Sequence, residues 1–182
     1  NNLIPKDVSI QVLTQARAPL IKRTLKSIEG SHSAILHLYN STSTAQRKYV
    51  FNKSQDEITS IATDGIDMIK KHLSNKHKNI MLEYSPESFT GTEIEFSVKI
   101  CNEVINHWGL STPIIINLPA TVEMFMPNVY ADMIEYCSKH LSNRNNIVLS
   151  VHTHNDRGTC TAATELALLA GADRVEGTLF GN

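Results

Sequence analysis

Short apolar runs alternate with amphipathic segments along the whole chain, and this alternation limits the possible fold more than any other feature. Aliphatic and β-branched runs, which are typical of strands, lie at residues 8–13, 34–39, 79–84, 113–118, 147–151 and 174–179. Apolar residues at helical spacing separate them, at residues 19–28, 58–73, 94–108, 129–141 and 161–169. Strand–helix alternation with nearly continuous apolar strands predicts a parallel sheet covered by helices.

Two α/β architectures fit this pattern, a doubly wound open sheet and a (β/α)8 barrel. A doubly wound nucleotide-binding sheet usually has a glycine-rich turn after its first strand, and residues 15–19 contain no glycine. The barrel is therefore favoured. Because a complete barrel typically takes ~250 residues and eight strand–helix units, the six strands predict an incomplete TIM barrel, with residues 1–182 as part of a single domain.

Charge and cysteine content limit the partners and the compartment. The formal net charge of -1 gives no electrostatic reason to expect nucleic acid or an anionic membrane as a partner. Cys101, Cys137 and Cys160 are odd in number and scattered, which favours a reducing compartment over a disulfide framework. No apolar run approaches ~20 residues and no charged-then-apolar leader opens the chain. We therefore expect a cytoplasmic protein, with a plastid as the alternative if the source is a plastid-bearing eukaryote.

A histidine pair ends the fifth apolar run. His152 and His154 flank Thr153, and because strand side chains alternate between faces, both imidazoles point the same way. Two neutral imidazoles side by side suit a divalent metal; the alternative is a solvated strand end with no ligand. A catalytic metal usually has about three protein ligands, so Asp156, Glu87 or a residue outside this chain has to complete the set.

Other polar residues lie near or just after the carboxyl ends of the expected strands, where parallel α/β folds place their working face. They are His37, Ser85, Glu87, Thr121 and the Gly181-Asn182 pair. Each has a structural alternative: His37 is equally consistent with a hydrogen-bonded core histidine, while the segments 85–87 and 121–123 are consistent with helix starts, in which a hydroxyl and a downstream acid form a cap. Convergence of these residues on one rim, beside the histidine pair, favours a small oxygen-rich site.

Several longer stretches resemble one family. They are QVLTQAR (11–17), LHLYNSTS (36–43), EYSPESFTGTE (83–93), NLPATVE (117–123), HTHNDRG (152–158) and EGTLFGN (176–182). Together they cover nearly the whole chain and look like the 2-isopropylmalate synthase family, in the longer of its two subfamilies. The HTHND motif is shared with related barrels, namely homocitrate and citramalate synthases and HMG-CoA lyases, whereas LYNSTS and EYSPESFTGTE narrow the resemblance.

The resemblance implies an acyltransferase of leucine biosynthesis that condenses acetyl-CoA with 3-methyl-2-oxobutanoate. It implies that His152 and His154 bind zinc, magnesium or manganese, that Ser85 and Thr121 hydrogen-bond the 2-oxoacid, and that the enzyme is a homodimer. His37 lines the same pocket and Glu87 matches a carboxylate near the acetyl group, so these two are the candidate catalytic residues. The group that removes the acetyl proton is left open.

The chain also departs from the family pattern. The family's first strand carries an Arg-Asp pair, with the Asp as third metal ligand, and the six strands found here correspond to the third to eighth. We therefore expect the first two strands and the C-terminal regulatory domain to be absent, and this polypeptide alone to be inactive. Two open sheet edges predict self-association or cover by another chain. The rival from a different class is a non-catalytic module that binds the ligand only.

Overall fold

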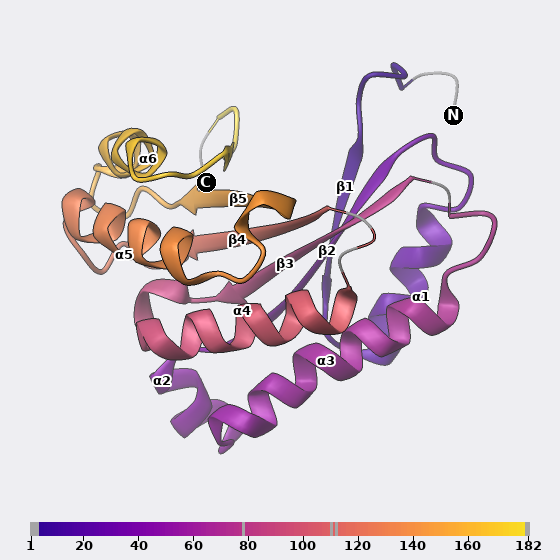
Figure 1. Ribbon diagram of the computed structural model, residues 1–182, viewed down its shortest axis with the longest axis horizontal. Coiled ribbons are helices and arrows are strands. Elements are labelled where there is room, and N and C mark those ends of the chain that lie inside the picture. Colours follow the sequence, from indigo (N-terminus) through magenta and orange to yellow (C-terminus); the bar gives the residue numbers. More distant parts are fainter. Residues whose placement is uncertain (1–3, 78, 110, 112, 181–182) are drawn as a thin grey trace.

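Six parallel strands form one curled sheet, in the order β1-β2-β3-β4-β5-β6 (Figure 1). The computed structural model describes residues 4–77, 79–109, 111 and 113–180. The strands are β1 (Ile10–Gln15), β2 (Ala34–Ser41), β3 (Ile80–Glu87), β4 (Ile114–Ala120), β5 (Ile147–Thr153) and β6 (Arg174–Glu176). Every strand is hydrogen-bonded in parallel to its sequence neighbour. This curled half-barrel confirms the predicted incomplete TIM barrel.

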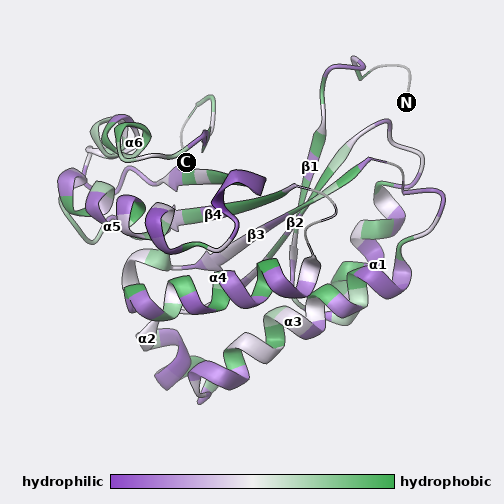
Figure 2. Ribbon diagram, viewed as in Figure 1, coloured by the Kyte–Doolittle hydropathy of each residue, from purple (hydrophilic) through white to green (hydrophobic). Residues whose placement is uncertain are grey.

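The helices cover one face of the sheet, and the five longer ones contact one another in the order α1, α3, α4, α5, α6 (Figure 1). They are α1 (Ala18–Ser27), the short α2 (Thr44–Gln46), α3 (Gln55–His72), α4 (Ile94–Trp108), α5 (Pro127–His140) and α6 (Cys160–Leu169). Short turns of other helix types lie at 47–51, 89–91 and 144–146. Apolar and polar residues alternate along α3 and α4 in Figure 2, as expected for helices with one face on a sheet. None of the helices in the described part of the chain is long and apolar enough to cross a membrane.

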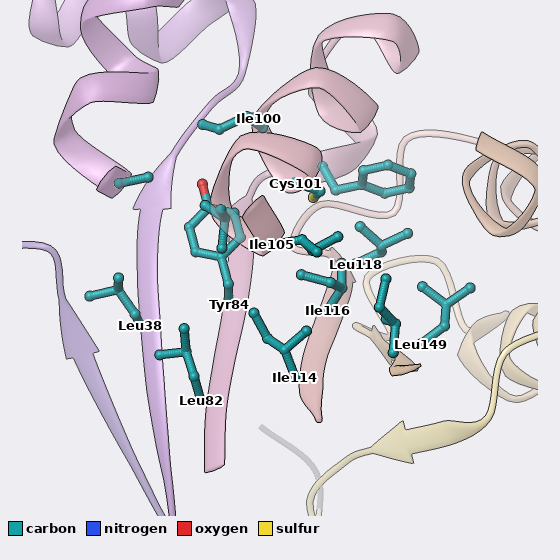
Figure 3. Close-up of a cluster of buried hydrophobic side chains, with 14 of the residues drawn as sticks. Leu38, Leu82, Tyr84, Ile100, Cys101, Ile105, Ile114, Ile116, Leu118 and Leu149 are labelled. Carbon is teal, nitrogen blue, oxygen red and sulfur yellow. The ribbon is translucent and has the colours of Figure 1, made fainter. Parts of the chain in front are cut away.

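The hydrophobic core lies between the sheet and these helices. Figure 3 shows Tyr84 of β3 and Ile116 of β4 beside Ile105 of α4, with Leu82 further along β3, and all four are fully buried. The Tyr84 hydroxyl donates to Asn40 Oδ1 at 2.8 Å, so the polar tip of this core residue is satisfied. Burying apolar surface at roughly 25 cal/mol per Å² makes this layer the main source of stability.

Helix α3 illustrates how local sequence fixes an element. Ser54 and Glu57 form a reciprocal capping box at its start, and basic residues fill its last turn, which favours the helix at both ends. In its middle, a Cβ on Gly65 would lie 3.2 Å from Ala16 Cβ and 3.3 Å from Leu38 Cδ2. Gly65 therefore permits the close approach of α3 to β2 and to the turn after β1.

Strand boundaries differ from the prediction where pairing extends a strand. The third strand was expected to end at Tyr84, but β3 continues to Glu87 because β2 continues beside it to Ser41. Pro86 lies within β3, at a position that pairs with β2 but lies beyond the β4 register. No residue of β4 is paired with Pro86. A proline, which has no backbone N–H, is tolerated at such an unpaired position. The structural alternative, that residues 85–87 start a helix, therefore does not hold.

The outer strands also differ from expectation. The first strand begins and ends two residues later than predicted, at Ile10 and Gln15, and the last strand ends at Glu176 instead of residue 179. Sheet pairing sets both limits, since β1 pairs with β2 from Ile10 onward and β5 offers β6 only three partners. The predicted site residues Gly181 and Asn182 lie outside the described residues.

Candidate functional site

Polar side chains occupy the face of the sheet that the helices leave uncovered. Because side chains alternate along a strand, residues between the apolar core positions point to this inner face. His37 and Glu83 are register partners in β2 and β3 and lie on it together. The other strands contribute Gln11, Asn117, Ser150, His152, Arg174 and Glu176.

His37 lies in the middle of β2, not near its end as predicted, because β2 continues beyond it to Ser41. Its Nε2 is 2.7 Å from Ser85 Oγ, and its Nδ1 is 3.1 Å from Gln11 Nε2 and 3.2 Å from Glu83 Oε1. Asn117 Nδ2 donates to the same Ser85 Oγ at 2.9 Å. The structure thus joins the two predicted residues, His37 and Ser85, by a direct hydrogen bond.

The hydrogen-bond network selects one tautomer of His37. Arg174 has only donors, and its Nη2 donates to Gln11 Oε1 at 2.7 Å, which turns the Gln11 amide nitrogen towards Glu176 and His37. His37 Nδ1 then accepts and Nε2–H donates to Ser85 Oγ. Burial lowers the pKa of His37 to about 4, with Arg174 and His152 adding to the effect and Glu176 opposing it. His37 is therefore neutral near pH 7.

The carboxyl groups of Glu83 and Glu176, both on the inner face, differ in protonation state. Burial raises the pKa of the fully buried Glu83 to about 9, and the neighbouring Glu176 adds to the increase. Burial alone would raise the pKa of Glu176, but hydrogen bonds with His152, Glu83, Gln11 and Arg174 lower it far below its usual value. Near pH 7 the cluster thus holds a neutral Glu83, an anionic Glu176 and the Arg174 cation.

One compact set of potential metal ligands is found among the described residues. Ligand atoms of His37, Glu83 and Glu176 lie within 4.8 Å of one another. However, Arg174 Nη1 already lies 2.6 Å from Glu176 Oε1 and 3.5 Å from Glu83 Oε2. A guanidinium in this position repels a second cation, and a protonated Glu83 is a poor ligand, so we interpret this set as a charge cluster and not a metal centre.

The histidine pair lies beside this cluster and is better suited to a metal. The rings of His152 and His154 are 5.2 Å apart between centroids and are tilted by 58°. Glu176 Oε2 lies 3.3 Å from His152 Nδ1, which orients the ring and leaves Nε2 for a ligand, as carboxylates do for metal-binding histidines. Both histidines line a cavity of about 550 Å³ at the end of β5. These donors fit a divalent cation.

Neither predicted third ligand forms a compact set with the two histidines in the described part of the chain. Asp156 lines the histidine cavity, but its Oδ2 accepts the backbone N–H of Glu123 at 2.9 Å. Glu87 accepts a hydrogen bond from Ser41 Oγ and lines a different cavity of about 440 Å³, which shares no lining residue with the first.

Thr121 lies in the bend after β4, where its Oγ1 accepts the backbone N–H of Ser88 at 3.0 Å. The structural alternative, that residues 121–123 start a helix, does not hold, because α5 begins at Pro127. Glu123 instead contacts the N-terminal end of a different helix, α6. Its carboxylate accepts the backbone N–H of Thr159, which precedes that helix.

Sequence reasoning missed most of the inner-face cluster. Gln11, Glu83, Asn117, Arg174 and Glu176 were not predicted as site residues. Gln11, Glu83 and Asn117 are polar residues between apolar ones in their strands, whereas Arg174 and Glu176 are the two ends of the short β6. The alternation of polar and apolar residues along a strand could have identified such residues, because a polar residue between two core positions points to the inner face.

Comparison with known proteins supports the predicted resemblance. The family model described as HMGL-like matches residues 3–182. Proteins named 2-isopropylmalate synthase match this chain at 55% identity in Clostridium acetobutylicum, 56% in Helicobacter hepaticus and 58% in an Arthrobacter species, in each case over 100% of the chain. The chain spans only 34%, 33% and 32% of these relatives, about a third of their length.

Solved structures agree on the fold. A hydroxymethylglutaryl-CoA lyase from Pseudomonas aeruginosa matches 96% of this chain and 54% of its own, with a TM-score of 0.70 and 14% identity. The carboxyl transferase domain of Rhizobium etli pyruvate carboxylase matches 93% of this chain and 27% of its own, with a TM-score of 0.59 and 11% identity. The match of the family model to nearly the whole sequence, together with the synthase relatives, shows that this chain belongs to the HMGL-like family.

Proposed function

We propose that the protein containing this chain is a 2-isopropylmalate synthase, which condenses acetyl-CoA with 3-methyl-2-oxobutanoate to give 2-isopropylmalate and CoA in leucine biosynthesis. The observation that carries this proposal is the 55–58% identity to proteins of that name over the whole chain. The polar groups on the inner face and at the strand ends support it, since they offer a cation site beside hydrogen-bond donors. A homodimer in the cytoplasm is part of the same proposal.

The proposed metal ligands are His152 and His154, with zinc, magnesium or manganese as the ion. When bound, the metal acts as a Lewis acid on the carbonyl of the 2-oxoacid. In this chain, Glu176 holds His152 through Nδ1, and the hydrogen bond from His154 N to Ala120 O at 3.3 Å ties the second histidine to the end of β4. These contacts orient the His152 ring and hold the backbone of His154 before the metal binds.

Ser85 and Thr121 are the proposed hydrogen-bonding groups for the 2-oxoacid, and His37 is proposed to lie beside the same substrate. Ser85 Oγ accepts from His37 Nε2–H and from Asn117 Nδ2, so its own proton is left to donate to another group. Thr121 Oγ1 accepts from Ser88 N, and its proton is available in the same way. Two hydroxyl groups that already accept hydrogen bonds, and whose protons are not engaged, are suited to donate to the oxygen atoms of an anionic substrate.

Glu87 is the proposed acceptor of the proton from the acetyl methyl group of acetyl-CoA. His37 is the less suitable base because both of its nitrogens are engaged, Nδ1 with Gln11 and Nε2 with Ser85. Glu87 lines the cavity of about 440 Å³ between the ends of β1 and β2, in which Tyr39 and Phe51 provide apolar surface. We propose that this cavity admits the acyl donor, and that the 2-oxoacid binds between Glu87 and the histidine pair, where its carbonyl carbon can meet the acetyl methyl carbon.

The test is an assay of the full-length protein for free CoA thiol released from acetyl-CoA in the presence of 3-methyl-2-oxobutanoate, with 2-isopropylmalate identified as product. Pyruvate and 2-oxoglutarate in place of this substrate separate the citramalate and homocitrate reactions. We expect Glu87→Gln to lower kcat by at least about a hundredfold. Glu135→Gln, which alters an exposed pair with Lys139, is the matched control. Preference for another 2-oxoacid, or an unchanged kcat in Glu87→Gln, would overturn these assignments.

The 182-residue chain alone is proposed to be inactive, since its described residues offer the histidine pair no compact third ligand. The same assay applied to the isolated chain tests this, and any turnover that depends on both substrates contradicts it. Calorimetry with zinc and 3-methyl-2-oxobutanoate then distinguishes the ligand-binding alternative, for which binding without turnover is expected even in the full-length protein.

A further inference from the structure

Three loops at the carboxyl ends of neighbouring strands are joined by hydrogen bonds. The loop after β3 donates to the loop after β4 through Ser88 N to Thr121 Oγ1 at 3.0 Å and through Thr90 Oγ1 to Val122 O at 2.8 Å. The loop after β4 is joined in turn to the loop after β5 through Glu123. Thr121 and His154, two of the residues in the proposed function, lie on the two sides of this second junction.

The Glu123 carboxylate collects donors from the loop after β5. Its Oε2 accepts the backbone N–H of Arg157, and its Oε1 accepts the hydroxyl of Thr159 and the Thr159 N–H, the last at 3.2 Å. Glu123 is only 7% exposed, so these bonds replace water around the charge. The donors lie at the start of α6, where the helix dipole also favours an anion.

The junction is reciprocal. While the Glu123 side chain accepts from the loop after β5, its backbone N–H donates to Asp156 Oδ2 at 2.9 Å. Arg157 Nη1 adds a bond to Phe125 O at 3.2 Å. Each loop therefore supplies both a carboxylate and a backbone donor to the other, which fixes their relative position more tightly than a single bond.

We propose that Glu123 is a positioning residue that sets the distance between His154 and Thr121, and thereby between the metal and the 2-oxoacid. Only one residue separates Glu123 from Thr121, and Asp156 is equally close in sequence to His154. A shift of about 1 Å between groups that bind one substrate can cost about a hundredfold in rate. The inference rests on the proposed function, but its first consequence, metal affinity, does not require turnover.

Substitution by glutamine is the informative change. Glutamine keeps the size of Glu123 but has one acceptor oxygen instead of two, and its amide N–H groups would face either Arg157 N–H or the Thr159 donors. A donor facing a donor breaks the junction without leaving a void. Thr159→Val removes the hydroxyl bond alone and leaves both backbone donors, so it weakens the junction by a smaller amount.

The experiment measures zinc affinity by calorimetry, KM and kcat, and melting temperature for full-length wild type, Glu123→Gln, Thr159→Val and the control Glu135→Gln. We expect Glu123→Gln to weaken zinc binding about tenfold and to raise KM for 3-methyl-2-oxobutanoate by a similar factor, with Thr159→Val intermediate and Glu135→Gln unchanged. A purely structural role would lower the melting temperature and leave zinc affinity intact.

Wild-type zinc affinity in Glu123→Gln overturns the inference, as does a change confined to the melting temperature. If Glu123→Gln does not fold, Thr159→Val decides: weakened zinc binding in the folded variant supports the inference and wild-type affinity overturns it. If the wild type binds zinc but does not condense the two substrates, the proposed function fails while the zinc titration still tests Glu123.

Discussion

Arg174 Nη2 donates to Gln11 Oε1 at 2.7 Å, although the two residues lie 163 positions apart in the chain. Gln11 belongs to β1 and Arg174 to β6, the two outer strands of the described sheet. This bond exists because the sheet curls until its outer strands face each other. Arg174 also contacts Glu176, Ser150 and Glu83, so one guanidinium joins the inner faces of four strands.

Replacing this guanidinium should destabilise the full-length protein. Arg174→Met keeps much of the apolar stem but leaves the anionic Glu176 without its partner at 2.6 Å. Removing one partner of a buried pair costs roughly 3 kcal/mol or more, and Arg174 is partly exposed, so we expect about 2 kcal/mol. Urea unfolding measures this loss. Arg174→Lys keeps the charge but not the fork of donors, so its free energy of unfolding should lie between those of wild type and Arg174→Met. An unchanged unfolding midpoint in Arg174→Met would contradict the central role of this residue.

Glu83 should reduce stability as the pH rises. Its pKa is raised from the usual 4.5 to about 9 in the folded protein, so between these pH values the folded state holds a proton that the unfolded state has released. The free energy of unfolding attributable to Glu83 therefore decreases from pH 4.5 towards pH 9, by up to about 1.4 kcal/mol per pH unit. Glu83→Gln removes this dependence, so it should unfold at a higher urea concentration than wild type at pH 8, and the advantage should shrink towards pH 4.5. A parallel pair of pH profiles would falsify the protonated state of Glu83.

His37 should make the stability of the protein depend on pH below neutrality. Its pKa is lowered from 6.5 to about 4 in the folded protein, so between these values the unfolded state binds more protons than the folded state. The contribution of His37 to stability is therefore complete above pH 6.5 and is lost as the pH falls to 4. Unfolding of His37→Gln, measured from pH 4 to 7, should depend less on pH than unfolding of wild type. Nitrogen NMR of wild type should also show a neutral His37 ring with its proton on Nε2. A proton on Nδ1 would contradict the hydrogen-bond directions inferred from Arg174 through Gln11 to His37.

The sequence predicted the layers of this fold better than its inner face. Apolar runs marked each strand because the side towards the helices requires residues such as Leu82 and Ile116. By contrast, Glu83 appeared as a single polar residue in an apolar run, and its partners lie in strands far away in sequence. The same applies to Glu123, which local spacing suggested as the cap of the next helix, whereas its carboxylate binds the start of α6. Hydrogen bonds between segments that are distant in sequence depend on sheet curvature and register, and local sequence patterns do not predict either.

The isolated 182-residue chain should self-associate. In the described sheet β1 and β6 have only one neighbouring strand each, and Leu13 and Val175 are 57% and 46% exposed on them. Unpaired strand edges with apolar side chains favour pairing with another chain. Light scattering should show a mass above that of the monomer that increases with concentration, and Leu13→Lys, which places a charge on the edge, should reduce it. A constant monomer mass at all concentrations contradicts this prediction.

Thr121 offers a direct test of how the 2-oxoacid is held. Its Oγ1 accepts from Ser88 N at 3.0 Å, so the single hydroxyl proton remains to donate to the substrate. Thr121→Val keeps the shape but removes both roles, and we expect at least a tenfold higher KM for 3-methyl-2-oxobutanoate in the full-length protein, because a lost bond to a charged group is worth roughly 1.5 to 3 kcal/mol. Thr121→Ser keeps the hydroxyl and should stay within about threefold of wild type, since it loses only a methyl group worth roughly 0.8 kcal/mol. KM for acetyl-CoA is the internal control: if Thr121→Val raises it equally, Thr121 supports the loop as a whole and does not bind the 2-oxoacid.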